Sequence, residues 1–394
     1  MFNTEQREQY ERDGYVVLRN QFSEAEMAAL NNVVDRNPPL DDGKLVGNWP
    51  EPGRYTLAKS SWCDADFVRF AEHPIVVSGA KELLNDDVRL TAYVMYDRTP
   101  GGKGIPPHHD YKRWRPVGSS LEWLFTIIPM CDFDEECGQL YIAPGSHHLD
   151  RRVDRGEGVL HMNEAIRPRA EDFIDPQLKR GDLLFMNMHL WHRAAGNNSN
   201  FHRRGLFNKY AAKHYPPATG YHVFSDDIYN LMSDAGKELI AVHSNKKIET
   251  TRLLLHRKVD DSSQFFFVKN GNTLSLPGGP VYFEDAIPDW DIGNYIGALQ
   301  TNILKQIRLE TPWVTYVGDY DEGEGLCRVY AYPMNSNGFP VSYDEGEWVD
   351  ESELTARNFE FEFECKAIED WLDPTMIRGK GLSQAKSRVD QFAY

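Results

Sequence analysis

The chain has 394 residues, a formal net charge of -17 and 41% hydrophobic residues. This length suits two domains, each with enough apolar residues to bury a core. The negative charge argues against a nucleic-acid partner, because binding a polyanion needs a basic surface. No uncharged apolar run approaches the roughly 20 residues that cross a bilayer, so neither membrane insertion nor export is expected.

The cysteines indicate a reducing environment. There are five of them, an odd number, and none is spaced as C-x-x-C. Neither a disulfide framework nor a zinc ribbon is therefore predicted, and the cytoplasm is the expected location.

Residues 1–235 read as short strands preceded by helices. Residues 4–13 are predicted as a charged helix, which Asp13-Gly14 ends before an apolar strand at 15–18. A second helix is expected after Ser23, which forms a capping box with Glu26. Further strand patterns, separated by turn residues, occupy 88–96, 121–131, 139–142, 183–191 and 205–211. Strands at this frequency argue for a sandwich or barrel, and we predict a double-stranded β-helix, or jelly roll.

The stretch Pro106-Pro107-His108-His109-Asp110-Tyr111 is a candidate metal site. Alternate side chains of a strand share a face, so His108 and Asp110 can point one way and His109 the other. The best candidate for a third ligand is His192, which the strand at 183–191 would deliver. Two imidazoles and one carboxylate on one side of a metal leave positions open and suit a non-haem Fe(II) oxygenase. The main competitor for His192 is His189, which strand parity places on the opposite face.

Five pieces of sequence add to this pattern. They are Arg12-Asp13-Gly14-Tyr15-Val16-Val17, His108-His109-Asp110, Pro144-Gly145-Ser146-His147, Gly181-Asp182-Leu183-Leu184-Phe185, and His192 followed by Asn197-Asn198-Ser199 and Arg203-Arg204. Their order over residues 8 to about 222 resembles the phytanoyl-CoA dioxygenase family of Fe(II)/2-oxoglutarate oxygenases. The resemblance implies His108, Asp110 and His192 as metal ligands, and Arg203 as the residue that grips the distal carboxylate of 2-oxoglutarate.

The same resemblance implies Fe(II), 2-oxoglutarate and O₂ as cofactor and co-substrates. The reaction would hydroxylate an unactivated C–H bond of a small metabolite or natural-product intermediate, releasing succinate and CO₂. Desaturation, epoxidation and cyclisation stay open, whereas the presence of Asp110 disfavours halogenation. Arg203 suits its role because a guanidinium pairs bidentately with a carboxylate, and it is expected on a strand next to the one that ends in His192. Thr126 is a second candidate for the 2-oxoglutarate site, with a core position as its alternative.

Other residues have two interpretations each. His147 and His148 are interpreted as structural, or as neighbours of the ligands. Arg204 is expected to face away from Arg203, toward the surface. The cations of residues 111–115 could recognise an anionic small-molecule substrate, or they could form surface salt bridges. Aromatic side chains could line an apolar wall of the pocket or simply pack: Trp114 and Trp123 with either Tyr93 or Tyr96.

Residues 236–394 are predicted as an α/β domain. Strands are expected at 252–258, 264–268, 313–319 and 326–332, and helices at 295–310 and 367–372. Together with Leu276-Pro277-Gly278-Gly279 and Glu347-Trp348-Val349, this order resembles a Nudix hydrolase domain over about residues 237–373. Nudix hydrolases carry several carboxylates on a metal-binding helix, and only Glu310 remains of them here. Because Mg²⁺ is bound through hard oxygen ligands, hydrolysis is not expected. The domain could instead be a lid, a homodimer surface or a substrate binder.

The alternative to an enzyme is a binding protein without catalytic activity. A jelly roll without catalysis could bind or sense a small metabolite, with the Nudix-like region as an interaction module. Formation of succinate distinguishes the enzyme from this sensor.

Overall fold

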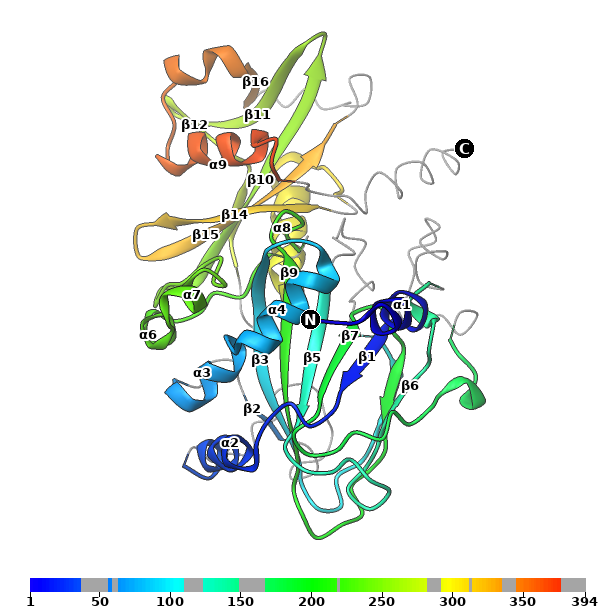
Figure 1. The fold of residues 1–394 in the computed structure, drawn as a ribbon. Coiled ribbons are helices and arrows are strands. Elements are labelled where there is room, and N and C mark those ends of the chain that lie inside the picture. Colours follow the sequence, from blue (N-terminus) through cyan, green and yellow to red (C-terminus); the bar gives the residue numbers. More distant parts are fainter. Residues whose placement is uncertain are drawn as a thin grey trace.

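The computed structural model describes residues 1–36, 56–58, 63–109, 123–148, 167–217, 220–281, 292–311, 314–334 and 345–376. Its first region is mainly β with helices, and a second sheet follows it in the chain (Figure 1). The segment that contains Asp110, residues 110–122, lies outside the described residues.

Two antiparallel sheets form the first region. The larger contains, in spatial order, β1 (Tyr15–Leu18), β7 (Leu183–Asn187), β5 (Trp123–Pro129), β9 (Arg203–Ala212), β3 (Val88–Arg98) and β2 (Thr56–Ala58). The smaller contains β4 (Ile105–His108), β8 (His192–Ala194) and β6 (Leu140–Ile142). Two layers of antiparallel strands are the arrangement that the predicted jelly roll requires.

Helices cover the outer face of the larger sheet, and their ends follow the predicted signals. In the capping box before α2 (Glu24–Arg36), the Ser23 backbone N–H donates to the Glu26 carboxylate at 2.8 Å. Gly14 ends α1 (Thr4–Asp13) in the left-handed conformation, with φ of 81°. The remaining helices in the described part of this region are α3 (Ala65–Ala71), α4 (Pro74–Leu84), the 3₁₀ turn η1 (Ala170–Asp172), α6 (Asp226–Leu231) and α7 (Asp234–Lys237).

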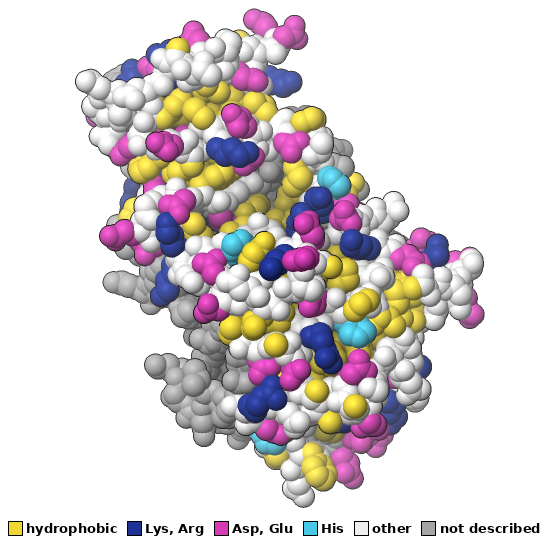
Figure 2. Space-filling model, turned by 60° about the vertical axis from the view of Figure 1, so that its left-hand side comes forward, with side chains coloured by type: hydrophobic (Ala, Val, Ile, Leu, Met, Phe, Trp, Pro, Cys, Tyr) yellow, Lys and Arg dark blue, Asp and Glu magenta, His cyan; other side chains and the backbone are white. Residues whose placement is uncertain are grey.

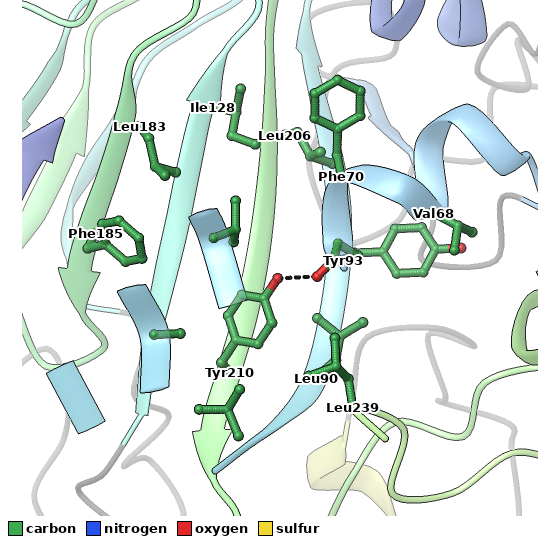
Figure 3. Packing of buried hydrophobic residues seen from close by; sticks show 14 of the residues in the cluster. Val68, Phe70, Leu90, Tyr93, Ile128, Leu183, Phe185, Leu206, Tyr210 and Leu239 are labelled. Atoms are coloured by element: carbon green, nitrogen blue, oxygen red, sulfur yellow. Dashed lines mark hydrogen bonds between the residues drawn. The ribbon is translucent and has the colours of Figure 1, made fainter. Parts of the chain in front are cut away.

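Strand β5 divides its side chains between two cores, because successive residues of a strand point to opposite faces. Leu124 and Ile128 belong to the core beneath the helices, whereas Phe125 and Ile127 belong to the core between the sheets. Figure 3 shows the first of these cores, where the Tyr210 hydroxyl donates to a backbone carbonyl of α3 at 2.6 Å. We call the space between the sheets the interior of the jelly roll.

The second region is a mixed sheet with a helix on each face. Leu254 packs with α9 (Phe363–Leu372) on one face, and its neighbours Leu253 and Leu255 pack with α8 (Ile292–Ile307) on the other. This α/β arrangement agrees with the predicted elements, whereas the resemblance to a Nudix domain stays a prediction. The other elements are β10 (Ile248–Val259), β11 (Ser262–Asn270), β12 (Thr273–Ser275), β13 (Gly278–Pro280), β14 (Thr315–Glu322), β15 (Gly325–Pro333), β16 (Gly346–Asp350) and the 3₁₀ turn η2 (Glu351–Ala356), with β10 and β15 parallel.

The two regions share a hydrophobic cluster. Ala211 at the end of β9 is buried with α8, and Trp123 at the start of β5 packs against this cluster and also against the interior core. A buried ion pair lies close by: Arg328 bonds Asp319 at 2.7 Å and also donates to the backbone carbonyl of Tyr221. The second region therefore rests on the end of the jelly roll where β5 starts and β9 ends, as Figure 1 shows.

Surface charge agrees with the composition. On the face shown in Figure 2, lysine and arginine side chains are scattered singly among aspartates and glutamates, with no broad basic surface. Among the helices of the described residues, none combines the length and apolar character needed to cross a bilayer.

Candidate active site

His108 and His192 meet across two strands of the smaller sheet. His108 ends β4 and His192 begins β8, where the two residues are direct partners in the antiparallel ladder. Their ring centroids lie 4.2 Å apart, and His192 is only 7% exposed. The structure thus brings two of the three predicted ligands together from positions 84 residues apart in the chain.

Both imidazoles are fixed in the same tautomer. Nδ1 of His108 bonds the carbonyl of Pro106 at 2.8 Å, and Nδ1 of His192 bonds the carbonyl of Leu190 at 3.0 Å. Because a carbonyl oxygen only accepts, each Nδ1 must carry the hydrogen, and the lone pair is then on Nε2. Two neighbouring Nε2 lone pairs, each oriented by a backbone carbonyl behind it, form a donor set that fits a divalent metal such as Fe(II).

Asp110, the predicted third ligand, lies outside the described residues. Within the described ranges no three His, Cys, Asp or Glu side chains are grouped so that they could hold a metal ion. The carboxylate of the proposed set therefore stays a prediction.

The turn at Pro144 to His147 holds the backbone next to His192. The Ser146 hydroxyl, which is buried, accepts the backbone N–H of Trp191 at 2.9 Å, and the Ala143 N–H donates to the Trp191 carbonyl at the same distance. His147 hydrogen bonds the carbonyl of Glu11 in α1. Ser146 therefore positions the residue before His192, and His147 ties the turn to the N-terminal helix.

The predicted strand from 183 to 191 is wrong in its second half. Strand β7 ends at Asn187, and the chain then turns, with the Leu190 N–H donating to the Asn187 carbonyl at 3.0 Å. His192 opens a new strand in the smaller sheet. The parity argument against His189 therefore fails, since the backbone between His189 and His192 is not extended.

Arg203 lies in the larger sheet, so the expectation that its strand neighbours the one bearing His192 is also wrong: β9 pairs with β3 and β5. The side chain is 3% exposed. Its Nε donates to the Gly138 carbonyl at 2.6 Å, and its guanidinium carbon lies 3.7 Å from the centroid of the Phe133 ring. These two contacts hold the guanidinium plane in one orientation.

Aromatic rings connect this arginine with the histidines. Arg203, Gly205 and Phe207 alternate along β9 and so share a face. A Cβ on Gly205 would lie 3.0 Å from Phe207 and equally near Phe133, so the missing side chain makes room for both rings. The Phe207 ring stacks 6.3 Å from that of Phe125, which lies 5.7 Å from the His192 ring. Arg203 and His192 therefore face the same interior.

Thr126 is not brought to this site. It alternates with Phe125 along β5 and so shares the face of Leu124 and Ile128, which pack beneath the helices. Its hydroxyl is fully buried and has no hydrogen-bond partner within the described part of the chain. The alternative interpretation, a core threonine, fits this position.

The neighbours of His108 and Arg203 point to the opposite face of their strands, as predicted. His109 packs edge-on to Trp191, with 5.1 Å between the rings, rather than joining His108. Arg204 faces away from Arg203 and bonds Asp97 at 3.2 Å.

Of the two tyrosines proposed for the pocket wall, the structure favours the second. Tyr96 packs on Phe207 at 4.6 Å, whereas Tyr93 packs on Phe67 in the core beneath the helices. Phe125 and Phe207 were not predicted as wall residues, although strand alternation could have found them. Phe133 lies in the irregular segment after β5, where no sequence pattern indicated it.

His108 and His192, which meet across the smaller sheet, would supply two of the three ligands that the iron site of a non-haem oxygenase requires. The family model described as phytanoyl-CoA dioxygenase (PhyH) matches residues 10–205. This part of the chain therefore belongs to the phytanoyl-CoA dioxygenase family, which confirms the predicted family.

Similar proteins include two ectoine dioxygenases. The one from Bordetella bronchiseptica is 25% identical over 236 residues, which cover 53% of this chain and 75% of that protein. The one from Stutzerimonas stutzeri is 26% identical over 230 residues, with 52% and 74% covered. Among solved structures, the non-heme alpha ketoglutarate dependent epimerase SnoN from nogalamycin biosynthesis is 21% identical, with a TM-score of 0.45 over 54% of this chain and 84% of its own.

Proposed function

We propose that the protein is an Fe(II)- and 2-oxoglutarate-dependent dioxygenase that hydroxylates an unactivated C–H bond of a small molecule. The observation that carries the proposal is the pairing of His108 with His192 in a common tautomer, facing the same interior as Arg203. Fe(II), when bound, would supply activation of O₂, with 2-oxoglutarate oxidised to succinate and CO₂.

Different residues of this chain would bind the metal and the 2-oxoglutarate. Nε2 of His108, Nε2 of His192 and the carboxylate of Asp110 would hold the metal from one side. The guanidinium of Arg203 would grip the distal carboxylate of 2-oxoglutarate, because its planar fork matches two carboxylate oxygens. Its contacts with Gly138 and Phe133 fix the direction of that fork before the ligand arrives.

The aromatic wall would keep bulk water from the reacting atoms. Phe125 is 1% exposed, and Phe207 and Tyr96 pack edge to face beside it. Exclusion of water strengthens the interaction of Arg203 with a carboxylate, since charges attract more strongly at low dielectric.

The substrate is proposed only by class. The ectoine dioxygenase relatives support a small metabolite or natural-product intermediate. An anionic group on it would be recognised by Lys112, Arg113 and Arg115, which lie outside the described residues. Hydroxylation is the proposed outcome, with desaturation, epoxidation and cyclisation as outcomes that a product analysis would separate.

Residues 236–394 are proposed as a separate Nudix-like domain without hydrolase activity. Glu310 lies beyond the end of α8, so this helix carries no acidic residue, whereas a Mg²⁺ site for pyrophosphate needs several carboxylates. The packing of Trp123 against both the shared cluster and the core between the sheets supports a role as a lid over this end of the jelly roll. A homodimer surface is the other role that an oligomer measurement would test. All five cysteines are free, which supports a reducing, cytoplasmic location.

The test begins with anaerobic Fe(II) and 2-oxoglutarate. The wild-type protein should give the weak visible charge-transfer band of the chelate, and His108→Ala or His192→Ala should abolish it. His243→Ala is the matched control, because this histidine hydrogen bonds Asp226 far along the chain from both ligands and should leave the band intact.

Succinate release across amino acids, acyl carriers, phosphonates and natural-product scaffolds then tests turnover. A band that survives in both histidine variants would refute the metal site. Ligand binding without succinate formation on any substrate would favour the metabolite sensor. Mg²⁺-dependent release of phosphate from a nucleoside diphosphate would overturn the proposal of an inactive second domain.

A further inference from the structure

Two cysteines that lie six residues apart in the chain meet close to Arg203. Cys131 follows β5 and Cys137 precedes β6, and their sulfur atoms are 3.7 Å apart in a thiol hydrogen bond. The connecting turn is fixed at Cys137, whose backbone N–H donates to the Asp134 carboxylate at 2.8 Å. The two thiols are therefore held together by the fold of the turn.

A disulfide between these sulfurs needs only a small movement. A disulfide has an S–S length of about 2.05 Å, so the sulfurs would have to approach by roughly 1.7 Å. Cys131 is partly exposed and Cys137 is 7% exposed, which favours a small oxidant over a bulky one.

The pair is also chemically asymmetric. Hydrogen bonds from Cys131 and Ser199, and the charge of Arg203, stabilise the thiolate of Cys137 and lower its pKa to about 7 against the effect of burial. The hydrogen bond to Cys137 and burial raise the pKa of Cys131. Cys137 is thus the nucleophile of the pair and Cys131 the resolving thiol, as in redox-sensitive cysteine pairs.

The site is linked to Arg203 through one residue. Gly138 follows Cys137, and its carbonyl accepts the Arg203 Nε at 2.6 Å. Gly138 has a φ of 98°, and a Cβ there would lie 2.8 Å from the carbonyl oxygens of Ala195 and Gly196, so the turn is tightly packed. A shift of Cys137 toward Cys131 would therefore move the carbonyl that orients the guanidinium.

We propose that Cys131 and Cys137 form a modification site at which hydrogen peroxide converts the two thiols to a disulfide, and that this disulfide weakens binding of 2-oxoglutarate at Arg203. The second part rests on the proposed function. The thiolate of Cys137 attacks one peroxide oxygen, which gives a sulfenic acid and hydroxide. The sulfur of Cys131 then attacks the sulfenic sulfur, forms the S–S bond and releases the second oxygen as water. Overall the thiols lose two electrons and two protons, and peroxide is reduced to two molecules of water.

The first experiment does not depend on oxygenase activity. The full-length protein, stripped of metal with a chelator, is treated with hydrogen peroxide, alkylated and digested. Mass spectrometry should find a linked Cys131–Cys137 peptide, which dithiothreitol removes. In Cys131→Ser the sulfenic acid on Cys137 should be trapped by dimedone, and Cys63→Ser, at an exposed cysteine, should form the link like the wild type. Absence of both the link and the trapped acid overturns the proposal.

The second experiment measures 2-oxoglutarate affinity of the Ni²⁺-loaded protein before and after oxidation. The dissociation constant should rise by about tenfold, as expected when a hydrogen bond that orients the guanidinium is disturbed. Dithiothreitol should restore it, and Cys131→Ser should show no response. A linked peptide with unchanged affinity refutes the coupling. A linked peptide in a protein that binds no 2-oxoglutarate in either state supports the thiol site and refutes the proposed function.

Discussion

Replacing Arg203 with lysine should weaken binding of 2-oxoglutarate while leaving the fold intact. The arginine is 3% exposed, and its guanidinium is held by the Gly138 carbonyl at 2.6 Å and by the Phe133 ring at 3.7 Å. Lysine keeps the positive charge, but it has no planar fork to lie on the ring and no second nitrogen for a bidentate contact.

The expected size follows from the lost hydrogen bond. A hydrogen bond to a charged group contributes about 1.5 to 3 kcal/mol. Loss of one of the two bonds to the carboxylate should therefore raise the dissociation constant of 2-oxoglutarate by about 10 to 150 times. The effect should appear in the KM for 2-oxoglutarate, because this contact is made in the ground state and the transition state alike.

Arg204→Lys is the matched control for this substitution. Arg204 is the next residue of the same strand, yet it faces the other way, toward Asp97 at 3.2 Å and Asp35 at 3.0 Å. Succinate release against 2-oxoglutarate concentration would be measured for both variants, with thermal unfolding as the check on the fold. Equal KM values for wild type and Arg203→Lys, or an equal increase in Arg204→Lys, would refute the assignment.

Three further substitutions have defined outcomes. Ser146→Ala leaves the buried Trp191 N–H without its acceptor. We therefore expect the free energy of unfolding in denaturant to fall by about 1 to 3 kcal/mol and the metal to bind more weakly. If neither quantity changes, the positioning role of Ser146 is refuted. Burial raises the pKa of Glu364 from 4.5 to about 7, so its contribution to stability is present below pH 4.5 and is lost as the pH rises through 7. In the wild type, the free energy of unfolding measured in urea should fall by on the order of 3 kcal/mol between pH 4.5 and pH 8. Glu364→Gln should abolish this fall, and a fall that persists in the variant would contradict the assignment. Arg328→Met leaves the buried carboxylate of Asp319 without its ion-pair partner. The free energy of unfolding, measured by thermal denaturation, should fall by about 3 to 5 kcal/mol, and a fall below about 1 kcal/mol would contradict this reasoning.

Much of the first region could be predicted from local patterns. The alternation along β5 predicts the division of Phe125 from Leu124, and the capping box at Ser23 predicts the start of α2, because both depend on neighbouring residues only. The meeting of His108 with His192 depends on strand pairing between distant segments, which no local pattern encodes. It was available only through the order of motifs shared with the family.

The failures have one physical cause. Both faces of β7 are buried, so the mainly apolar stretch from Leu183 to Trp191, which contains Asn187 and His189, lacks the regular alternation that would mark where the chain leaves the sheet. A turn of buried residues then looks like a continued strand. For Thr126 the sequence left two interpretations open, because its strand could be predicted but which of its faces turns toward the helices could not.

The shared motifs combine residues that do chemistry with residues that only hold the fold. Asp182, in the Gly181-Asp182 piece, is 1% exposed and accepts from the backbone N–H groups of Asn20 and Lys179 at 3.0 and 2.9 Å, so it locks β7 to the end of β1. A buried carboxylate with these partners cannot be moved without stranding its charge. An order of motifs can identify the family even where the relatives are only about 25% identical.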